Sequence, residues 1–172
     1  MNKKKRTKLI FIIISIILVL IFVLYIFFSN KQKSIMYCYK EANLHNGIKQ
    51  TMSYELFRSN NTVKIKENIK IILSDEINKQ LILKGYNLSV LEDLFRKSIE
   101  KYFSQKISNE IKNYTTYNFY IENETIYIDA EYIIDKKNND GFTKFFKIDF
   151  YSSKQPEILK YFEGGKMKCE IN

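Results

Sequence analysis

The chain is poor in the residue types that most enzyme motifs need. Its 172 residues include five Gly, two Cys, one Pro, one His and no Trp. We find no Gly-rich phosphate loop, GxSxG elbow, HExxH pair or CxxC pair, and no long Gly-, Ser- or Pro-rich linker. Acidic side chains remain as the only credible catalysts. The heavy use of Ile, Lys and Asn is typical of a low-GC bacterial genome.

The single histidine limits the catalytic and metal chemistry further. A catalytic triad, a Cys-His dyad or a His-rich zinc site would have to be built on His45 alone. That residue sits beside the Asn46-Gly47 turn pair. We therefore expect no catalytic, cofactor-binding or metal-binding residue, and no cofactor.

One long apolar run stands near the N-terminus. Leu9 to Phe28 are twenty consecutive positions of which only Ser15 and Tyr25 carry a polar atom. As a helix this run would extend roughly 30 Å, the thickness of the hydrocarbon core of a bilayer. The run is longer than the apolar core of a signal peptide and lacks a small-residue cleavage site. The sequence predicts a signal-anchor, a single transmembrane helix at residues 9–28.

Most of the excess positive charge lies in front of this run. The formal net charge is +9, and residues 1–8 hold five of the 28 basic residues, so 23 basic and 19 acidic residues give the rest +4. The positive-inside rule then predicts a cytoplasmic tail at 1–8 and an extracytoplasmic C-terminal part. We expect a cell-membrane location and no nucleic acid as a partner.

After a short linker at 29–34, residues 35–172 predict one α+β domain. Apolar and polar residues alternate at 48–57 and 63–73, the pattern of strands with one buried face, and the alternation at 63–73 is broken only by Glu67. The aromatic-rich segment 35–41 reads as the partner of 48–57 in a hairpin. Three antiparallel strands therefore open the domain.

Helical patterns follow. Ser74 starts a short helix that ends near Gly85, and Ser89 with Glu92 forms a capping box. From there to Ile111 apolar residues recur at three- and four-residue spacing, which predicts the best helix outside the apolar run. We expect it to pack on a sheet, the alternative being a helix that binds a membrane or a partner.

The remaining segments predict strands and a short tail. A second hairpin is expected from 117–121 and 126–134, then a turn at 139–141 and a strand through Phe146, Ile148 and Phe150. Pro156 is placed to start a short helix before a last strand at 167–171. The predicted fold class is α+β: a single N-terminal transmembrane helix followed by an antiparallel sheet with one long amphipathic helix packed on one face.

Two acidic groups are candidates for chemistry. Asp129 and Glu131 are two residues apart on a predicted strand and share a face, as a carboxylate pair for glycan hydrolysis would require. Asp135, Asn138 and Asp140 crowd a loop that suggests calcium, although their spacing differs from an EF-hand. We interpret the first group as the wet face of a strand and the second as a turn.

Cys38 and Cys169 lie in the first and last predicted strands, outside the membrane. They are a candidate disulfide, which would close a loop of about 130 residues and stabilise the domain by roughly 5 kcal/mol. The alternative is two unpaired thiols.

The layout of an apolar N-terminus, an early Cys38, the helix from Ser89 to Ile111 and the segment ETIYIDAEY (124–132) resembles the YehR-like small exported lipoproteins of low-GC bacteria. The resemblance implies an exported, surface-tethered α+β domain and no particular activity. The lipobox of that family is absent, since Tyr37 precedes Cys38.

The sequence thus predicts a single-pass, membrane-anchored extracytoplasmic protein that is not an enzyme and acts as a binding or accessory module of the cell envelope. Its expected partner, besides the membrane, is another envelope protein or a cell-wall component. Two alternatives stay open: an envelope hydrolase that uses acidic residues, and a subunit of a secretion or pilin-like assembly.

Overall fold

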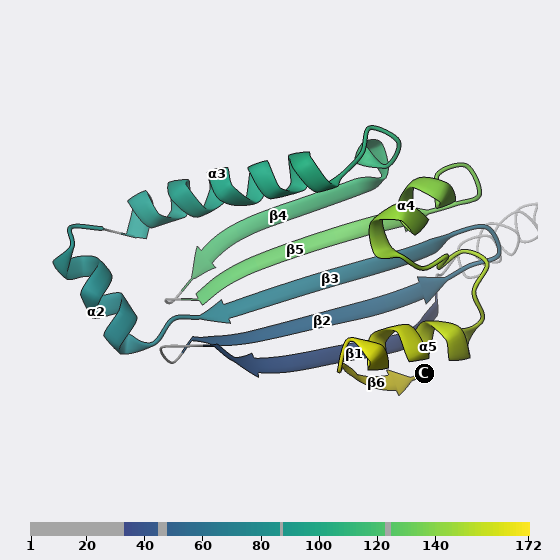
Figure 1. Ribbon diagram of the computed structural model, residues 1–172, viewed down its shortest axis with the longest axis horizontal. Coiled ribbons are helices and arrows are strands. Elements are labelled where there is room, and N and C mark those ends of the chain that lie inside the picture. The colour runs from purple at the N-terminus through teal and green to yellow at the C-terminus, as the bar shows by residue number, and fades with distance from the viewer. Residues whose placement is uncertain (1–32, 45–47, 87, 123–124) are drawn as a thin grey trace, which may run out of the picture. The chain divides into compact units, whose positions relative to one another are not determined.

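Six strands form one antiparallel sheet in the computed structural model, which describes residues 33–44, 48–86, 88–122 and 125–172. The strands are β1 (Lys33–Asn43), β2 (Lys49–Arg58), β3 (Val63–Ile72), β4 (Thr115–Glu122), β5 (Thr125–Ile134) and β6 (Lys168–Ile171), as Figure 1 shows. Their order across the sheet is β4-β5-β3-β2-β1-β6. The predicted hairpins β1-β2 and β4-β5 are confirmed, and the last strand joins the sheet beside the first.

Four α-helices and one 3₁₀ turn complete the described chain: α2 (Asp75–Leu83), α3 (Leu88–Lys106), η2 (Lys112–Tyr114), α4 (Asn139–Phe146) and α5 (Gln155–Gly164). Ser74 caps α2, because its Oγ accepts the backbone N–H of Ile77 at 3.3 Å. Gly85 follows α2 with φ +81°, the left-handed conformation that favours glycine after a helix. The sequence signals for the start and end of this helix are therefore confirmed.

The strands alternate between two faces that differ in character. The covered face carries the core, into which α3, α4 and α5 send buried side chains. The core consists of Met36, Cys38, Leu56, Val63, Ile65, Phe103, Ile111, Ala130, Tyr132, Ile134, Phe142, Phe146, Phe150, Ile158, Phe162 and Met167. The open face carries the intervening residues of the same strands, among them Lys64, Lys66 and Glu131, which are partly exposed. Residues Ser34–Asn172 form one compact unit around this core.

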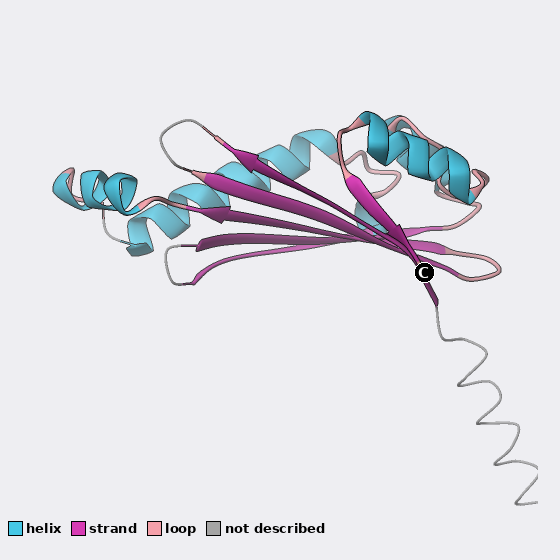
Figure 2. Cartoon of the chain, turned by 90° about the horizontal axis from the view of Figure 1, so that it is seen from below, coloured by secondary structure: helices cyan, strands magenta, loops and turns pink. Residues whose placement is uncertain are grey.

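The sheet is twisted, as right-handed strand twist requires. In the view of Figure 2 the strands lie close together near the C-terminus and spread apart toward the opposite end. Helix α5 lies next to β6 at the first of these ends (Figure 1).

The predicted fold class is wrong as stated. Instead of a sheet with one long amphipathic helix, the described residues form a six-stranded sheet with four α-helices. Within residues 33–44, 48–86, 88–122 and 125–172 no helix is long and apolar enough to cross a membrane. The predicted transmembrane helix at 9–28, like the tail at 1–8, lies outside the described residues.

The predicted turn at 139–141 and strand at 146–150 are also wrong, because α4 occupies most of this segment. Phe142 and Phe146 are four residues apart, so a helix buries both against the sheet, and their exposed fractions are 1% and 8%. Gly141 is needed for a close approach rather than for a turn. A Cβ atom at this position would lie 2.6 Å from Cγ2 of Ile111.

Helix α3 is shorter than predicted. It ends at Lys106, whereas the apolar spacing continues to Ile111. Ile111 is 1% exposed and reaches the core from the turn before η2, so its burial does not require a helix. Apolar periodicity located the buried residues here but misplaced the end of the helix.

Candidate functional site

Glu67 is an acidic residue on the covered face of the sheet. It lies in β3 between Ile65, which is fully buried, and Ile69, and the period-2 alternation of the strand turns all three toward the helices. Its side chain is half-buried. An ionised carboxylate on an apolar sheet face costs free energy unless other groups compensate for its charge.

Two tyrosines provide that compensation. The Oη atom of Tyr132, on β5, donates to Oε2 of Glu67 at 2.6 Å. The Oη atom of Tyr54, on β2, donates to Oε1. Tyr54 and Ala130 are the cross-strand neighbours of Glu67, so the three polar side chains come from three adjacent strands. Each carboxylate oxygen thus accepts one phenol hydroxyl.

Both phenols are held in their neutral, donating form. Burial raises the pKa of Tyr132 above its ordinary value, and the negative charge and hydrogen bond of Glu67 raise it further. The same causes, in the same order, raise the pKa of Tyr54. At Tyr161, on α5, the pKa is also raised by burial and then by the charge of Glu67.

Packing fixes the two tyrosine rings. The ring of Tyr54 lies 5.1 Å from that of Phe162, between centroids. The ring of Tyr132 meets Phe146 edge to face at 5.0 Å and Phe145 at 5.7 Å. Because α4 and α5 supply these aromatic partners, the two C-terminal helices determine where the hydroxyls point.

The three residues line a cavity of about 420 Å³ on the covered face. Its floor comes from β2, β3 and β5, and its walls come from α3 on one side and from α4 and α5 on the other. Tyr102 of α3 and Tyr161 of α5 are 54% and 36% exposed, and both contribute to the lining. The remaining lining is aliphatic or aromatic except for Lys106, whose side chain is exposed.

Glu67 has no ionic partner among the residues that the structure describes, where ion pairs are formed by Lys64 with Glu131, Arg96 with Glu92, Lys97 with Asp93 and Lys144 with Glu110. Among the described residues, its charge is therefore balanced by the hydroxyl dipoles of Tyr54 and Tyr132 alone. A carboxylate accepts about four hydrogen bonds, and two are made here. This arrangement leaves acceptor capacity in a cavity whose other lining residues are aliphatic or aromatic, apart from Lys106.

The acidic pair that the sequence singled out lies on the other side of the sheet. Asp129 and Glu131 are on the open face of β5, where Glu131 forms an ion pair with Lys64 at 2.8 Å. They border a depression of about 320 Å³ with Lys66 and the asparagines 68 and 118. Burial raises the pKa of Asp129, whose side chain is partly exposed. The structure does not bring this pair near Glu67.

The other acidic group forms a turn. Asp135 Oδ1 accepts the backbone N–H groups of Lys137 and Asn138, at 2.7 and 3.1 Å. Asn138 in return accepts the N–H of Asp135 with Oδ1 and donates to the carbonyl of Ile133. Asp135 and Asn138 shape the connection from β5 into α4, as the interpretation as a turn predicted, whereas Asp140 lies in the first turn of α4. His45 lies outside the described residues.

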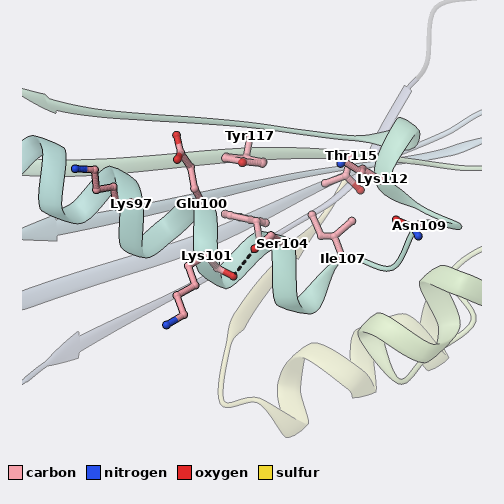
Figure 3. A pocket seen from close by; sticks show the side chains of 10 residues that line it. Lys97, Glu100, Lys101, Ser104, Ile107, Asn109, Lys112, Thr115 and Tyr117 are labelled. Atoms are coloured by element: carbon pink, nitrogen blue, oxygen red, sulfur yellow. Dashed lines mark hydrogen bonds between the residues drawn. The ribbon is translucent and has the colours of Figure 1, made fainter.

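A second cavity, of about 450 Å³, lies between α3 and β4 (Figure 3). Its charged lining consists of Lys97, Glu100, Lys101 and Lys112, all exposed. Lys97 is already paired with Asp93 at 2.7 Å, and Figure 3 shows the ammonium groups of Lys97 and Lys101 pointing in different directions. Because its charges are solvated and do not converge, this cavity is the weaker candidate.

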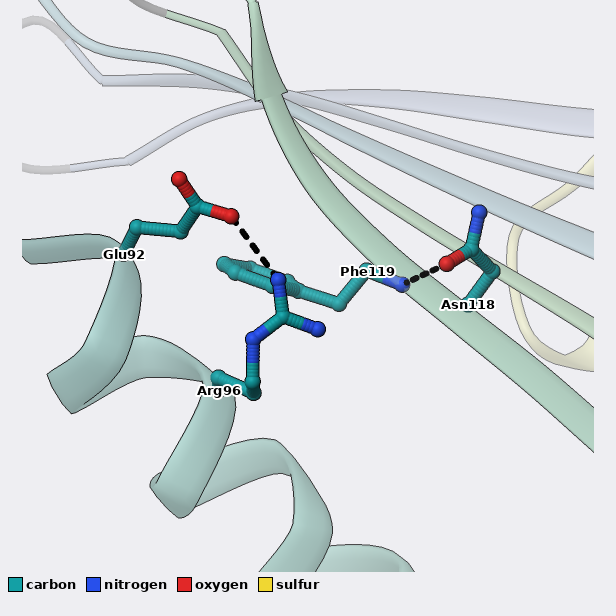
Figure 4. A network of polar contacts seen from close by, with 4 residues as sticks. All are labelled: Glu92, Arg96, Asn118 and Phe119. Carbon is teal, nitrogen blue, oxygen red and sulfur yellow. Dashed lines mark hydrogen bonds and ion pairs between the residues drawn. The ribbon is translucent and has the colours of Figure 1, made fainter. Parts of the chain in front are cut away.

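Beside it, α3 rests on β4 through aromatic rings. Phe103 stacks on Tyr117 with centroids 4.3 Å apart. Arg96 lies one helical turn after Glu92 and forms an ion pair with it. Arg96 also lies over the ring of Phe119, with its guanidinium carbon 5.5 Å from the ring centroid (Figure 4). These contacts hold the wall of the Glu67 cavity that α3 provides.

The two cysteines are joined at the edge of the sheet away from β4. Cys38 of β1 and Cys169 of β6 are register partners with Cα atoms 4.0 Å apart, and a disulfide connects them. The bond joins the last two strands in the order of the sheet, next to α5. It takes no part in the lining of the Glu67 cavity.

The chain matches no known family model, no curated protein and no solved structure. Sequence reasoning missed Tyr54, Tyr132 and the role of Glu67, yet one signal was present. Glu67 is the one polar residue at an apolar position of the alternating third strand, and a charge at an expected core position is a common sign of a functional site.

Proposed function

We propose that the compact unit Ser34–Asn172 is a non-catalytic binding module of the cell envelope and that the cavity around Glu67 is its ligand site. The observation that carries this proposal is a half-buried carboxylate, bonded by two tyrosines and without an ionic partner in the described chain, in a cavity of about 420 Å³. Small-molecule sites commonly combine apolar walls with a few convergent polar groups.

The envelope location belongs to the same proposal. It is supported by the basic residues before the apolar run, and by the disulfide, because disulfides persist mainly in oxidising compartments outside the cytoplasm. We propose that the unit faces the exterior of the cell membrane and meets an envelope protein or a wall component there. Protease added to intact protoplasts should then degrade it, whereas its protection would contradict the location.

The hydrolase alternative has less support. Glycoside hydrolysis ordinarily needs two carboxylates on either side of the scissile bond. In the Glu67 cavity the other ionisable lining residues are tyrosines and Lys106. On the open face, Glu131 of the Asp129/Glu131 pair forms an ion pair with Lys64.

Native mass spectrometry of protein purified from its own envelope tests the binding function. Wild-type protein should carry an adduct of constant mass. Ile99→Trp, which places a large ring in the cavity wall, should lose it. Leu94→Trp is the matched control and should retain the adduct. Leu94 lies on the same helix but outside the cavity, and it is 49% exposed. Absence of any adduct, or equal retention by Ile99→Trp, would argue against the cavity as the site.

A further inference from the structure

The lining of the Glu67 cavity restricts the charge of a ligand. The carboxylate uses one lone pair on each oxygen for Tyr54 and Tyr132, and about two acceptor positions are left. A ligand that donates hydrogen bonds would fill them, whereas a carboxylate or phosphate ligand would be repelled. The apolar walls also strengthen any charge–charge contact made inside, because they lower the local dielectric.

The aromatic rings favour the same ligand charge. Seven of the thirteen lining residues are Tyr or Phe, and the faces of aromatic rings attract cations through their quadrupole. Lys106 is the one basic lining residue, and it is exposed and forms no ion pair with Glu67. Its charge therefore remains solvated and does not neutralise the carboxylate.

We infer that the Glu67 cavity binds a small organic cation, with a protonated amine or ammonium group at Glu67 and an apolar body between the aromatic walls. This inference rests on the proposed function, since it assigns a ligand class to that cavity. The head group would complete the hydrogen bonding of the carboxylate with charge-assisted bonds. The volume of about 420 Å³ suits a compact molecule rather than a polymer.

The test compares three probes that share one body and differ in charge: phenethylammonium, 2-phenylethanol and 3-phenylpropanoate. Each is titrated by calorimetry into the full-length chain in amphipol. We expect the ammonium to bind at least about tenfold more tightly than the alcohol, and the carboxylate to bind weakest. Glu67→Gln should reduce the ammonium to the affinity of the alcohol and leave the alcohol unchanged.

Glu55→Gln is the matched control, because Glu55 lies on the open face of β2 opposite Lys66. It should alter none of the three affinities. Equal affinity of the wild type for all three probes, or tightest binding of the carboxylate, would overturn the cation inference and leave the binding function intact. If no probe binds, the proposed function is contradicted as well. The wild-type comparison decides these outcomes even if Glu67→Gln does not fold.

Discussion

The covered face of the sheet has two ends that are packed very differently. At one end, α4 and α5 bury Phe142, Phe146, Ile158 and Phe162, each less than 10% exposed. At the other end, α2 buries no side chain, and Leu83 is 85% exposed. Among the side chains of α3 that the structure describes, Phe103 alone is fully buried.

This difference shows where the stability of the domain resides. Hydrophobic stabilisation follows the apolar area removed from water, so the C-terminal helices contribute most of what the helices add to the core. They also hold the rings of Tyr54 and Tyr132. The Glu67 cavity thus has one firmly packed wall, from α4 and α5, and one lightly packed wall, from α3. Motion that admits a ligand is expected on the α3 side.

The largest expected effect tests this contrast directly. Phe142→Ala should lower the free energy of unfolding by about 3 to 5 kcal/mol, because it removes a fully buried ring from the packed end. Leu94→Ala on α3, where the side chain is 49% exposed, should change it by less than about 0.5 kcal/mol. Urea unfolding followed by circular dichroism measures both. Similar costs at the two positions would mean that the two ends contribute alike.

The disulfide belongs to the packed end, because β6 follows α5. Cys169→Ser should lower stability by about 2 to 5 kcal/mol, since the bond closes a loop between residues 131 positions apart. The same urea experiment in reducing buffer should bring the wild type to the stability of the variant. Protein taken from its envelope should have a mass two hydrogens below that of the reduced chain. Two thiols that alkylate freely in that protein would remove this contribution.

Much of the sheet could be predicted from the sequence. Five of the six strands appear as alternating or aromatic-rich segments bounded by turn residues, and the sixth as a short C-terminal segment. The helical segments were harder. The longest run of helical apolar spacing belongs to α3, yet few of its described side chains are buried. Leu94 and Tyr102 on this helix are exposed.

Helix α4 was missed because its signals are ambiguous over a short length. Asn139-Asp140-Gly141 is a common turn sequence, and Phe146, Ile148 and Phe150 alternate as a strand would. Only the close approach of Gly141 to Ile111 explains why a glycine stands inside a helix.

The Glu67 site could be predicted only in part, since the broken alternation was visible but pairing with Tyr54 and Tyr132 depends on strand order. That order joins β3 to β5, which are distant in sequence.

Two glycines of the C-terminal helices form the next comparison. Gly141→Ala should cost about 1 to 3 kcal/mol, because the added methyl would overlap Cγ2 of Ile111, 2.6 Å away, in a filled core. Gly164→Ala, at the last residue of α5 with no atom within 4 Å of the new Cβ, should be neutral or stabilise by up to about 1 kcal/mol. Thermal and urea unfolding of the two variants give the difference. A tolerated alanine at Gly141 would show that α4 can move away from Ile111.

The smallest expected effect concerns Tyr54 and Tyr132, which lie between the two ends of the covered face. Burial, and then the charge of Glu67, raise the pKa values of Tyr54 and Tyr132 above the ordinary 10.0. The folded chain therefore keeps two phenol protons that the unfolded chain loses above about pH 10. The contribution of the two tyrosines to the free energy of unfolding is complete below that pH and falls as the pH rises. The limiting slope is about 1.4 kcal/mol per pH unit for each tyrosine. Between about pH 9 and about pH 11, the free energy of unfolding in urea should fall by about 1.4 kcal/mol less in Tyr54→Phe or Tyr132→Phe than in the wild type, and by about twice that amount less in the double variant. Identical slopes in all four proteins would mean that both phenols titrate like those of the unfolded chain, and that the cavity does not hold them as hydrogen-bond donors to Glu67.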